Sequence, residues 1–213
     1  GQVQTIMDTL ILEGVQPLFM IGKVGKEIIF DRARLDSKAR AILARLNDKD
    51  DNAIMKAIVE ELRDAGIKVL DQTLYLSDLL ATKGILTKKQ PDKRQWIDIE
   101  YGMMMAKEIA RLNIGQAVVV KDRTVLAVEA QEGTDEMILR AGVAGKEGLV
   151  VTKTSKIGHD VRFDIPTVGS STIKSLIKVK AGVLAIESGK VLIVDKDEMI
   201  EKADKAKIVV VGV

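Results

Sequence analysis

The chain has 213 residues, a formal net charge of +2, 30% charged residues and 3% aromatic residues. The nearly balanced charge gives no electrostatic footprint for nucleic acid and the few aromatic side chains argue against base-stacking surfaces, so we expect no nucleic-acid partner. No cysteine is present and only one histidine, which excludes disulfides and zinc–thiolate sites and leaves a hard cation such as Mg²⁺ on carboxylates as the expected metal.

The N-terminal part of the chain alternates helical and strand patterns, which favours a parallel α/β domain. Apolar residues with helical spacing at 3–10 precede PLFMIG (17–22), a short run typical of a buried strand. A second amphipathic helix is predicted at about 52–65, and IKVL (67–70) follows as another strand. Because the first helix leads into a strand with almost nothing before it, we expect a truncated Rossmann-like domain whose first βα elements are missing.

A change of composition marks the predicted domain boundary. TKGILTKKQPD (82–92) contains a glycine, a proline and four charges, which is typical of a connecting segment. Asp92 then caps a long predicted helix, with Gln95 at its third position. We predict an N-terminal α/β domain at 1–85, a linker at 86–93 and a catalytic C-terminal domain at 94–213.

From residue 117 onwards the pattern predicts a mixed-sheet α+β domain. Six short Val-rich strands are expected, with the sequences AVVV, TVLAVEA, LVVT, GVLAIES, KVLIVD and IVVVG. The links KDR (121–123) and SG (188–189) are typical of tight hairpins between neighbouring strands. Helices are expected at about 134–141, 170–180 and 196–206, with Asp195 capping the last one.

The stretch VEAQEGTDEMILRAG (128–142) is the first candidate site. A strand carrying Glu129 runs into a glycine and then a helix, whose free N–H groups can bind an anion. Thr134 either caps that helix or binds phosphate. The alternative is a plain strand–turn–helix with an acidic first turn, which the helix dipole favours. The crowding of Glu129, Glu132 and Asp135 in one turn favours a cation or a basic partner.

The stretch DVRFDIPTVG (160–169) is the second candidate site. Its proline favours extended backbone before it, so Asp164 is expected near the end of an extended segment. The helix entry Gly-Ser-Ser that follows would make a second phosphate cradle beside this carboxylate. The alternative is a charged edge strand in which Arg162 pairs with Asp160 or with Asp164. The residue types alone leave the two interpretations even.

Two lysines complete the candidates that the residues themselves suggest. Lys23 and Lys153 each end an apolar strand, and basic residues in that position often face ligands in α/β folds, although most surface lysines do not. No Walker loop, nucleophile elbow or dinucleotide fingerprint is present. Magnesium-assisted phosphate chemistry is therefore plausible, while the substrate stays open.

Three stretches together resemble the UDP-2,3-diacylglucosamine pyrophosphatases of the LpxI type. They are IGQAVVVKDRTVLAVEAQEGTDEMILRAG (114–142), VRFDIPTVG (161–169) and the closing IVVVGV, and the resemblance covers nearly the whole chain. The family cleaves UDP-2,3-diacylglucosamine to UMP and 2,3-diacylglucosamine 1-phosphate in the lipid A pathway of Gram-negative bacteria. The resemblance implies two domains with the lipid between them, a magnesium cofactor and attack of water on the α-phosphorus.

The resemblance also assigns residues. Asp164 matches the aspartate of the family's R-x-D-x-P-T motif and is the expected catalytic residue. We favour metal ligation over a role as base, because an exposed aspartate flanked by arginine should have a low pKa. The metal ligands expected are Asp164, Glu129 and Asp135. The substrate-binding residues expected are Lys23, Gln116, Glu132, Gly133, Thr134, Lys153, Arg162, Thr167 and Gly169.

The expected partners follow from the substrate. The resemblance implies a lipid-linked UDP-sugar, a homodimer and contact with the inner-membrane surface through a local apolar or basic patch. The opening residues lack the features of a secretory signal and no apolar run is long enough to span a bilayer, so we expect a cytoplasmic, peripheral enzyme. The alternatives are a non-catalytic phosphosugar- or nucleotide-binding module and a structural domain whose carboxylates only pair with arginine.

Overall fold

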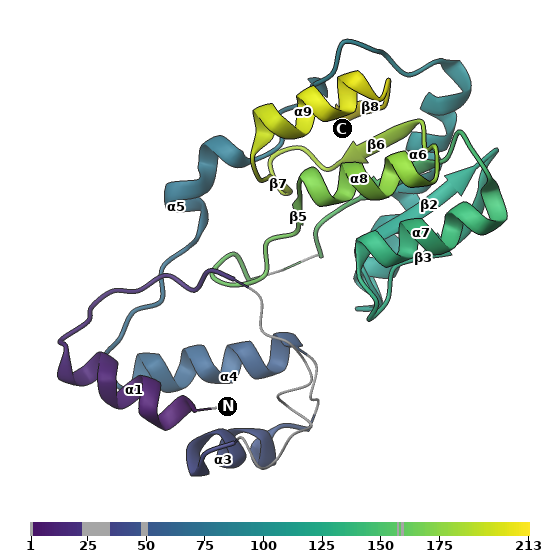
Figure 1. Cartoon of the computed structure of the whole chain (residues 1–213). Helices are drawn as coiled ribbons and strands as arrows, with labels where there is room; N and C mark the ends of the chain where they lie inside the picture. The colour runs from purple at the N-terminus through teal and green to yellow at the C-terminus, as the bar shows by residue number, and fades with distance from the viewer. Residues whose placement is uncertain (1, 23–34, 48–50, 157, 159) are drawn as a thin grey trace. The chain divides into compact units, whose positions relative to one another are not determined.

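The chain folds into two compact units in the computed structural model, which describes residues 2–22, 35–47, 51–156, 158 and 160–213 (Figure 1). Unit 1 comprises Gly1–Tyr75 and Asp160–Asp164, and unit 2 comprises Leu76–His159 and Ile165–Val213. The chain therefore leaves unit 1, builds most of unit 2, returns to unit 1 for five residues and then completes unit 2. Lys23 lies outside the described residues.

Unit 1 is mainly helical in its described part. Its helices are α1 (Val3–Leu12), α3 (Ser37–Arg45), α4 (Asp51–Asp64) and the short α5 (Thr73–Leu76), which continues to the boundary with unit 2. The two predicted strands meet in one parallel bridge between Leu18 and Val69. Since the described residues of unit 1 show no longer strand, the parallel pairing is confirmed at that point and the Rossmann-like arrangement stays a prediction.

A small apolar core holds unit 1 together. It consists of Met7, Val59, Leu62, Ile67 and Val69, and the aromatic ring of Phe163 packs against it. The Gln72 N–H also donates to the Val161 carbonyl at 3.1 Å. The short segment at 160–164 is thus fixed to unit 1 both by packing and by a backbone hydrogen bond.

Unit 2 is built on a six-stranded sheet whose mixed pairing is as the sequence predicts. Five of the six predicted strands belong to it, whereas KVLIVD lies outside it and the strand at Gly84–Ile85 was not predicted. The strand order is β1 (Gly84–Ile85), β8 (Val209–Gly212), β6 (Val183–Ile186), β4 (Val150–Lys153), β2 (Ala117–Lys121) and β3 (Thr124–Val128). The central strands β4, β6 and β8 are parallel and every residue in them is buried. Uninterrupted burial of this kind is expected where helices cover both faces of a sheet.

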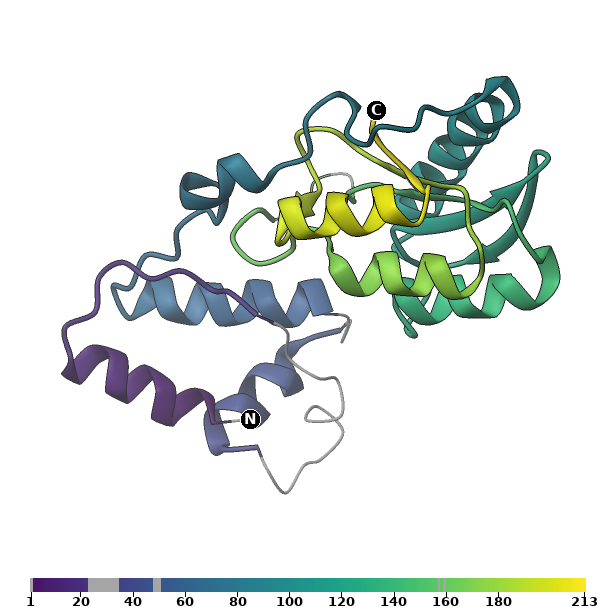
Figure 2. The same ribbon diagram turned by 45° about the horizontal axis from the view of Figure 1, so that its top comes forward.

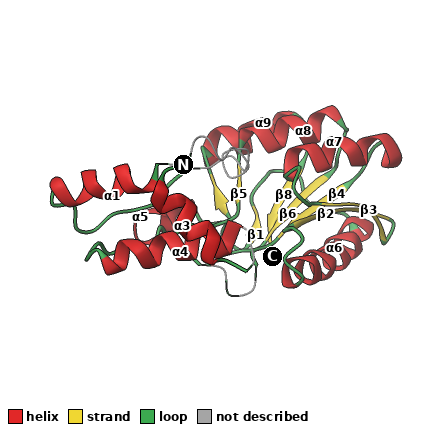
Figure 3. Cartoon of the chain, turned by 90° about the horizontal axis from the view of Figure 1, so that it is seen from below, coloured by secondary structure: helices red, strands yellow, loops and turns green. Residues whose placement is uncertain are grey.

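Helices cover both faces of that sheet (Figures 2 and 3). The helix α6 (Lys93–Arg111) lies on one face, and α7 (Thr134–Gly145), α8 (Ser170–Lys178) and α9 (Lys196–Lys205) lie on the other. A short 3₁₀ helix, Ser77–Leu79, precedes β1. None of the helices in the described ranges is both long and apolar enough to cross a bilayer.

The predicted helix caps have opposite outcomes. Asp92 accepts the Gln95 N–H at 2.9 Å and Gln95 Oε1 accepts the Asp92 N–H at 3.0 Å, so the cap of α6 is confirmed as a reciprocal capping box. Asp195 is the N-cap residue of α9 as predicted, but its backbone is left-handed (φ 50°) and its side chain makes no capping bond. An N-cap side chain needs extended backbone at its own residue to reach the helical N–H groups.

One of the two predicted hairpins is correct. β2 and β3 are joined by Asp122 and Arg123, both at positive φ, and the buried Asp98 carboxylate accepts their N–H groups at 2.9 and 2.7 Å. The hairpin predicted at 188–189 is wrong. There β6 stays in the large sheet, while β7 (Leu192–Ile193) pairs in parallel with β5 (Thr167–Val168).

Backbone hydrogen bonds explain why residues 188–189 do not form a hairpin. The Ser188 N–H donates to the Val213 carbonyl and the Gly189 N–H to the Ala81 carbonyl, both at 2.8 Å. These partners are more than twenty residues away on either side, so the link is held by distant segments and not by a return of the chain on itself. Such pairing leaves no local sequence signal.

Candidate active site

Three parallel strands end at the same edge of the six-stranded sheet, and this edge forms the candidate site. β2 is antiparallel to β4 and so begins where β4 ends, with Ala117 opposite Lys153. β3 is antiparallel to β2 and ends there too, directly before Glu129. In open α/β sheets, ligands bind in the crevice outside the carboxyl ends of the parallel strands. We call this side of unit 2 the carboxyl edge.

A continuous series of hydrogen bonds joins three buried polar side chains at the carboxyl edge. Lys153 Nζ donates to Thr134 Oγ1 at 2.6 Å, and Thr134 Oγ1 donates to Glu129 Oε1 at 2.6 Å. The other carboxylate oxygen, Glu129 Oε2, accepts the backbone N–H of Gln116 at 3.0 Å. Each of the three side chains belongs to a residue at most 9% exposed, so the lysine and glutamate charges compensate one another through the hydroxyl and not through water.

Two glycines set the backbone of this cluster. A Cβ at Gly115 would lie 2.1 Å from the Glu129 carbonyl oxygen, so only glycine allows the start of β2 to approach the end of β3 this closely. At Gly133 φ is +85°, a conformation that turns the chain into α7 and favours glycine. Together they hold the Gln116 N–H and the Thr134 hydroxyl against the Glu129 carboxylate.

The entry to α7 differs from the predicted one. Gly133 and not Thr134 is the N-cap, and no side chain caps the helix, so the first of the two roles offered for Thr134 is excluded. The Thr134 hydroxyl is instead committed to Glu129 and Lys153. Asp135 lies in the first turn as predicted, and its Oδ1 is buried with no hydrogen-bond partner among the described residues.

Glu187 belongs to the carboxyl edge and was missed by the sequence analysis. It follows β6, and its carboxylate accepts the Ser155 N–H at 3.1 Å, the Thr154 hydroxyl, and Lys190 Nζ at 2.9 Å. Burial raises the pKa of this carboxyl, but the hydrogen bonds from Thr154, Lys190 and Ser155 outweigh burial and bring the pKa to about 2. Glu187 thereby fixes the turn that follows Lys153. A charged residue ending an apolar strand, the pattern used for Lys153, could have revealed it.

The predicted extended segment at 160–164 is a turn, so that expectation is wrong. The Asp164 N–H donates to the Asp160 carbonyl at 2.9 Å, and the Asp160 carboxylate accepts the Arg162 N–H at 3.1 Å, a local bond that favours a turn over a strand. Arg162 Nε and Nη2 also donate to the two Asp160 oxygens at 2.8 and 2.5 Å. These bonds lower the pKa of Asp160. The pairing of Arg162 with Asp160 is confirmed, but it occurs in a turn and not in the charged edge strand of that alternative.

The Asp164 side chain differs from its neighbours in this turn. It is half-buried, and within the described part of the chain its carboxylate accepts no hydrogen bond. Asp164 is also the last residue of unit 1 before the chain enters unit 2. Its carboxylate is therefore available to a ligand, whereas that of Asp160 is committed to Arg162.

The other predicted substrate-binding residues lie outside this series of hydrogen bonds. Glu132 pairs with Arg140 at 2.5 Å, which lowers the pKa of Glu132. Thr167 is exposed, and its hydroxyl donates to a backbone carbonyl two residues earlier at 3.1 Å. Gly169 is the N-cap of α8 with extended backbone, a conformation open to any residue.

The fit of Mg²⁺ to the predicted ligands is uneven. Asp135 Oδ1 and Gln116 Oε1 are buried acceptors with no partner in the described ranges, and such oxygens are unfavourable unless a donor or a cation satisfies them. Glu129 fits poorly, because both of its oxygens accept hydrogen bonds and the nearby Lys153 already supplies positive charge. No three acidic or histidine side chains within the described residues could hold a metal by themselves. Mg²⁺ commonly takes one or two carboxylates and completes its shell with water and substrate phosphates, so Asp135 fits it.

Two family models match the chain in sequence order. The LpxI N-terminal domain matches residues 1–79, and the LpxI C-terminal domain matches residues 82–211. The chain belongs to the LpxI family. The family resemblance seen in the motifs is thereby confirmed, and the LpxI C-terminal domain contains every residue of the carboxyl edge named above.

Individual relatives agree with the LpxI family models. The UDP-2,3-diacylglucosamine pyrophosphatase LpxI of Caulobacter vibrioides is 30% identical over 224 aligned residues, which cover all of this chain and 80% of that protein. Among solved structures, RibD of Acinetobacter baumannii has a TM-score of 0.33 and 15% identity, over 53% of this chain and 34% of that one. That structural likeness is too low to carry an argument.

The depressed pKa of Glu187 predicts acid sensitivity. A carboxyl whose pKa falls from its ordinary 4.5 to about 2 on folding contributes stability that is present above pH 4.5 and is lost as the pH falls through 2. The contribution is at most about 3 kcal/mol. Glu187→Gln should therefore destabilise the protein at neutral pH and flatten the decline of unfolding free energy between pH 4.5 and 2, measured by urea denaturation. Glu201→Gln, at an exposed pair, is the control, and equal slopes for wild type and Glu187→Gln would contradict the prediction.

Proposed function

We propose that this protein is a hydrolase that cleaves the pyrophosphate bond of UDP-2,3-diacylglucosamine to UMP and 2,3-diacylglucosamine 1-phosphate, a step of lipid A biosynthesis. The observation that carries the proposal is the match of the whole chain to 80% of the C. vibrioides pyrophosphatase. The carboxyl edge supports it, because hydrolysis of a pyrophosphate requires fixed N–H donors and cations around the developing negative charge. Attack of water on the α-phosphorus would leave the new oxygen on UMP.

The groups available at the carboxyl edge suit phosphate oxygens. The N–H groups at the start of α7 have no side-chain cap, and they present the positive end of the helix dipole. Lys153 adds a positive charge whose position is fixed by its bond to Thr134. We propose Gln116, Gly133, Thr134, Lys153, Thr167 and Gly169 as substrate contacts, while Lys23 stays an expectation from the family resemblance. Glu132 and Arg162 already have ion-pair partners in their own segments, so we give them supporting roles.

The carboxylates divide into two groups by their hydrogen bonds. Asp135, in unit 2, has a buried oxygen atom without a partner in the described part of the chain, and we propose that it holds Mg²⁺. The Asp164 carboxylate, in unit 1, also accepts no hydrogen bond there, and we propose it as the catalytic carboxylate. Mg²⁺, when bound, would neutralise charge on the pyrophosphate oxygens. Glu129 is assigned a positioning role, because its two oxygens fix the Gln116 N–H and the Thr134 hydroxyl.

The setting proposed for the enzyme follows from its substrate. A lipid-linked UDP-sugar is held in a membrane, so a cytoplasmic enzyme acting on it would work at the inner-membrane surface. The homodimer and the catalytic assignment of the domain at 94–213 are proposed from the family resemblance. The location of the buried polar cluster within unit 2 is consistent with that catalytic assignment.

The proposed activity predicts which product forms and which substitution lowers turnover. With Mg²⁺, the purified protein should release UMP from UDP-2,3-diacylglucosamine, measured by chromatography. Asp164→Ala should lower turnover by about 10²–10⁴-fold, because it removes a carboxylate and leaves the backbone bond of its turn intact. Asp64→Ala, at an exposed position of unit 1, should keep wild-type turnover. If the wild-type protein binds UMP but produces no UMP from UDP-2,3-diacylglucosamine, it is a non-catalytic binding module.

The different roles proposed for Glu129 and Asp135 give a second prediction. Asp135→Asn should raise the Mg²⁺ concentration needed for half-maximal turnover about tenfold or more, and it should weaken the rise in melting temperature that Mg²⁺ causes with UMP present. Glu129→Gln should lower turnover and leave that Mg²⁺ concentration unchanged, because the carboxylate positions donors and does not bind the metal. An equal shift of Mg²⁺ dependence in both variants would show that Glu129 is a ligand.

A further inference from the structure

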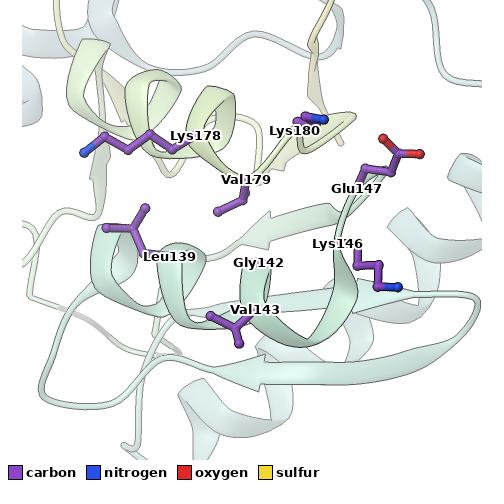
Figure 4. A pocket seen from close by; sticks show the side chains of 8 residues that line it. All are labelled: Leu139, Gly142, Val143, Lys146, Glu147, Lys178, Val179 and Lys180. Atoms are coloured by element: carbon purple, nitrogen blue, oxygen red, sulfur yellow. The ribbon is translucent and has the colours of Figure 1, made fainter.

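A hollow of about 430 Å³ lies between the C-terminal ends of α7 and α8 (Figure 4). Close approach of the two helices forms its floor, since a Cβ at Gly142 would lie 2.3 Å from Val179 Cγ1. Apolar and basic side chains share its lining. We call it the basic groove, and its principal residues are Leu139, Val143, Lys146, Lys178, Val179 and Lys180.

The three lysines of the basic groove are not required to satisfy the helix ends. Lys121 Nζ already donates to the Gly145 and Glu147 carbonyls at 3.1 and 2.9 Å. The last carbonyls of α8 accept backbone N–H groups from the residues that follow the helix. Within the described residues none of the three lysines forms an ion pair, and one acid, Glu147, lines the groove with them (Figure 4). The groove therefore has uncompensated positive charge.

Each of the two helices that border the groove has an exposed apolar side chain. Val143 is 87% exposed and Ile177, directly before Lys178, is 45% exposed. A strongly exposed valine gains nothing from water or from a small anion, whereas it can enter the boundary between lipid headgroups and acyl chains. Lysine suits the same boundary, because its apolar stem lies along the acyl region while its ammonium reaches the headgroups.

We propose that the basic groove docks the protein on an anionic phospholipid surface. Lys146, Lys178 and Lys180 would contact phosphate headgroups, and Val143 and Ile177 would enter the outermost acyl region. Charge complementarity supports a negative partner, and the exposed apolar pair favours a bilayer over nucleic acid or a soluble anion. The biological purpose of this surface rests on the proposed lipid-linked substrate.

The position of the basic groove keeps the candidate site open. α7 begins at the carboxyl edge with Thr134 and ends at the groove after 12 residues, a length of about 18 Å. Docking through the groove would therefore hold the protein at a membrane without covering Glu129, Thr134 and Lys153. Turnover of a water-soluble short-chain substrate should not depend on the groove.

Vesicle binding of the whole protein tests the proposal. Wild type should co-sediment with vesicles of phosphatidylglycerol and phosphatidylcholine, and much less with pure phosphatidylcholine. Lys146→Gly/Lys180→Gly should weaken binding about 25-fold, since each lysine near an anionic surface contributes about fivefold. Both lysines have positive φ (61° and 52°), so glycine removes the charge and relieves the backbone. Val143→Asp should weaken binding as well.

The matched control is Lys83→Ala/Lys196→Ala, which removes two charges from unit 2 outside the basic groove and should bind like wild type. Circular dichroism of each variant verifies that it is folded. The proposal is overturned if the folded Lys146→Gly/Lys180→Gly variant binds like wild type, if both vesicle types bind equally, or if inorganic phosphate displaces the protein as a soluble ligand would. Vesicle binding is measured without turnover. Docking can therefore be confirmed when the proposed hydrolysis is not, and hydrolysis can be confirmed when docking is not.

Discussion

Burying Lys153 and Glu129 at the end of a sheet is favourable only if each compensates the other, and the carboxyl edge is arranged around that requirement. The two charges do not touch. The Thr134 hydroxyl stands between them, accepting from the ammonium and donating to the carboxylate at 2.6 Å each. This fixes the first residue of α7 relative to the ends of β3 and β4. A second buried carboxylate, Glu187, fixes the turn after β4 in the same way.

A site of this kind holds its donors before a ligand arrives. The Gln116 N–H and the Thr134 hydroxyl donate to Glu129, so the donors left for a ligand are the uncapped N–H groups at the start of α7. The bonds among Glu129, Thr134 and Lys153 fix the position of this helix end, so little reorganisation is needed when negative charge develops. The acceptors Asp135 Oδ1 and Gln116 Oε1 lack partners in the described part of the chain. The cluster therefore contains hydrogen-bonded groups that fix the positions of their neighbours and unpaired oxygens that can bind a ligand or a cation. This division is expected of an active site.

Sequence patterns predicted the elements that depend on neighbouring residues. The capping box at Asp92, the two-residue turn at 122–123 and the helices of unit 2 all have local signals, and all are confirmed. The turn at 160–164 was missed although its bond from the Arg162 N–H to Asp160 is local. Two other failures depend on distant partners or on backbone angles. Asp195 has left-handed backbone, and the link at 188–189 bonds to Ala81 and Val213. At the candidate site, the pattern of a basic residue at the end of an apolar strand identified Lys153. Its hydrogen bond to Thr134 could not be predicted, because only the folded sheet brings these two residues together.

The central claim is that the carboxyl edge of unit 2 binds the nucleotide pyrophosphate. Backbone amide NMR during titration with UMP and Mg²⁺ tests it most directly, because the product carries the phosphate that the edge should bind. We expect saturable shifts of the amides of Gln116, Thr134, Asp135 and Lys153, with no comparable shift at the basic groove. Saturable shifts confined to other parts of unit 2, with the carboxyl edge unchanged, would contradict it.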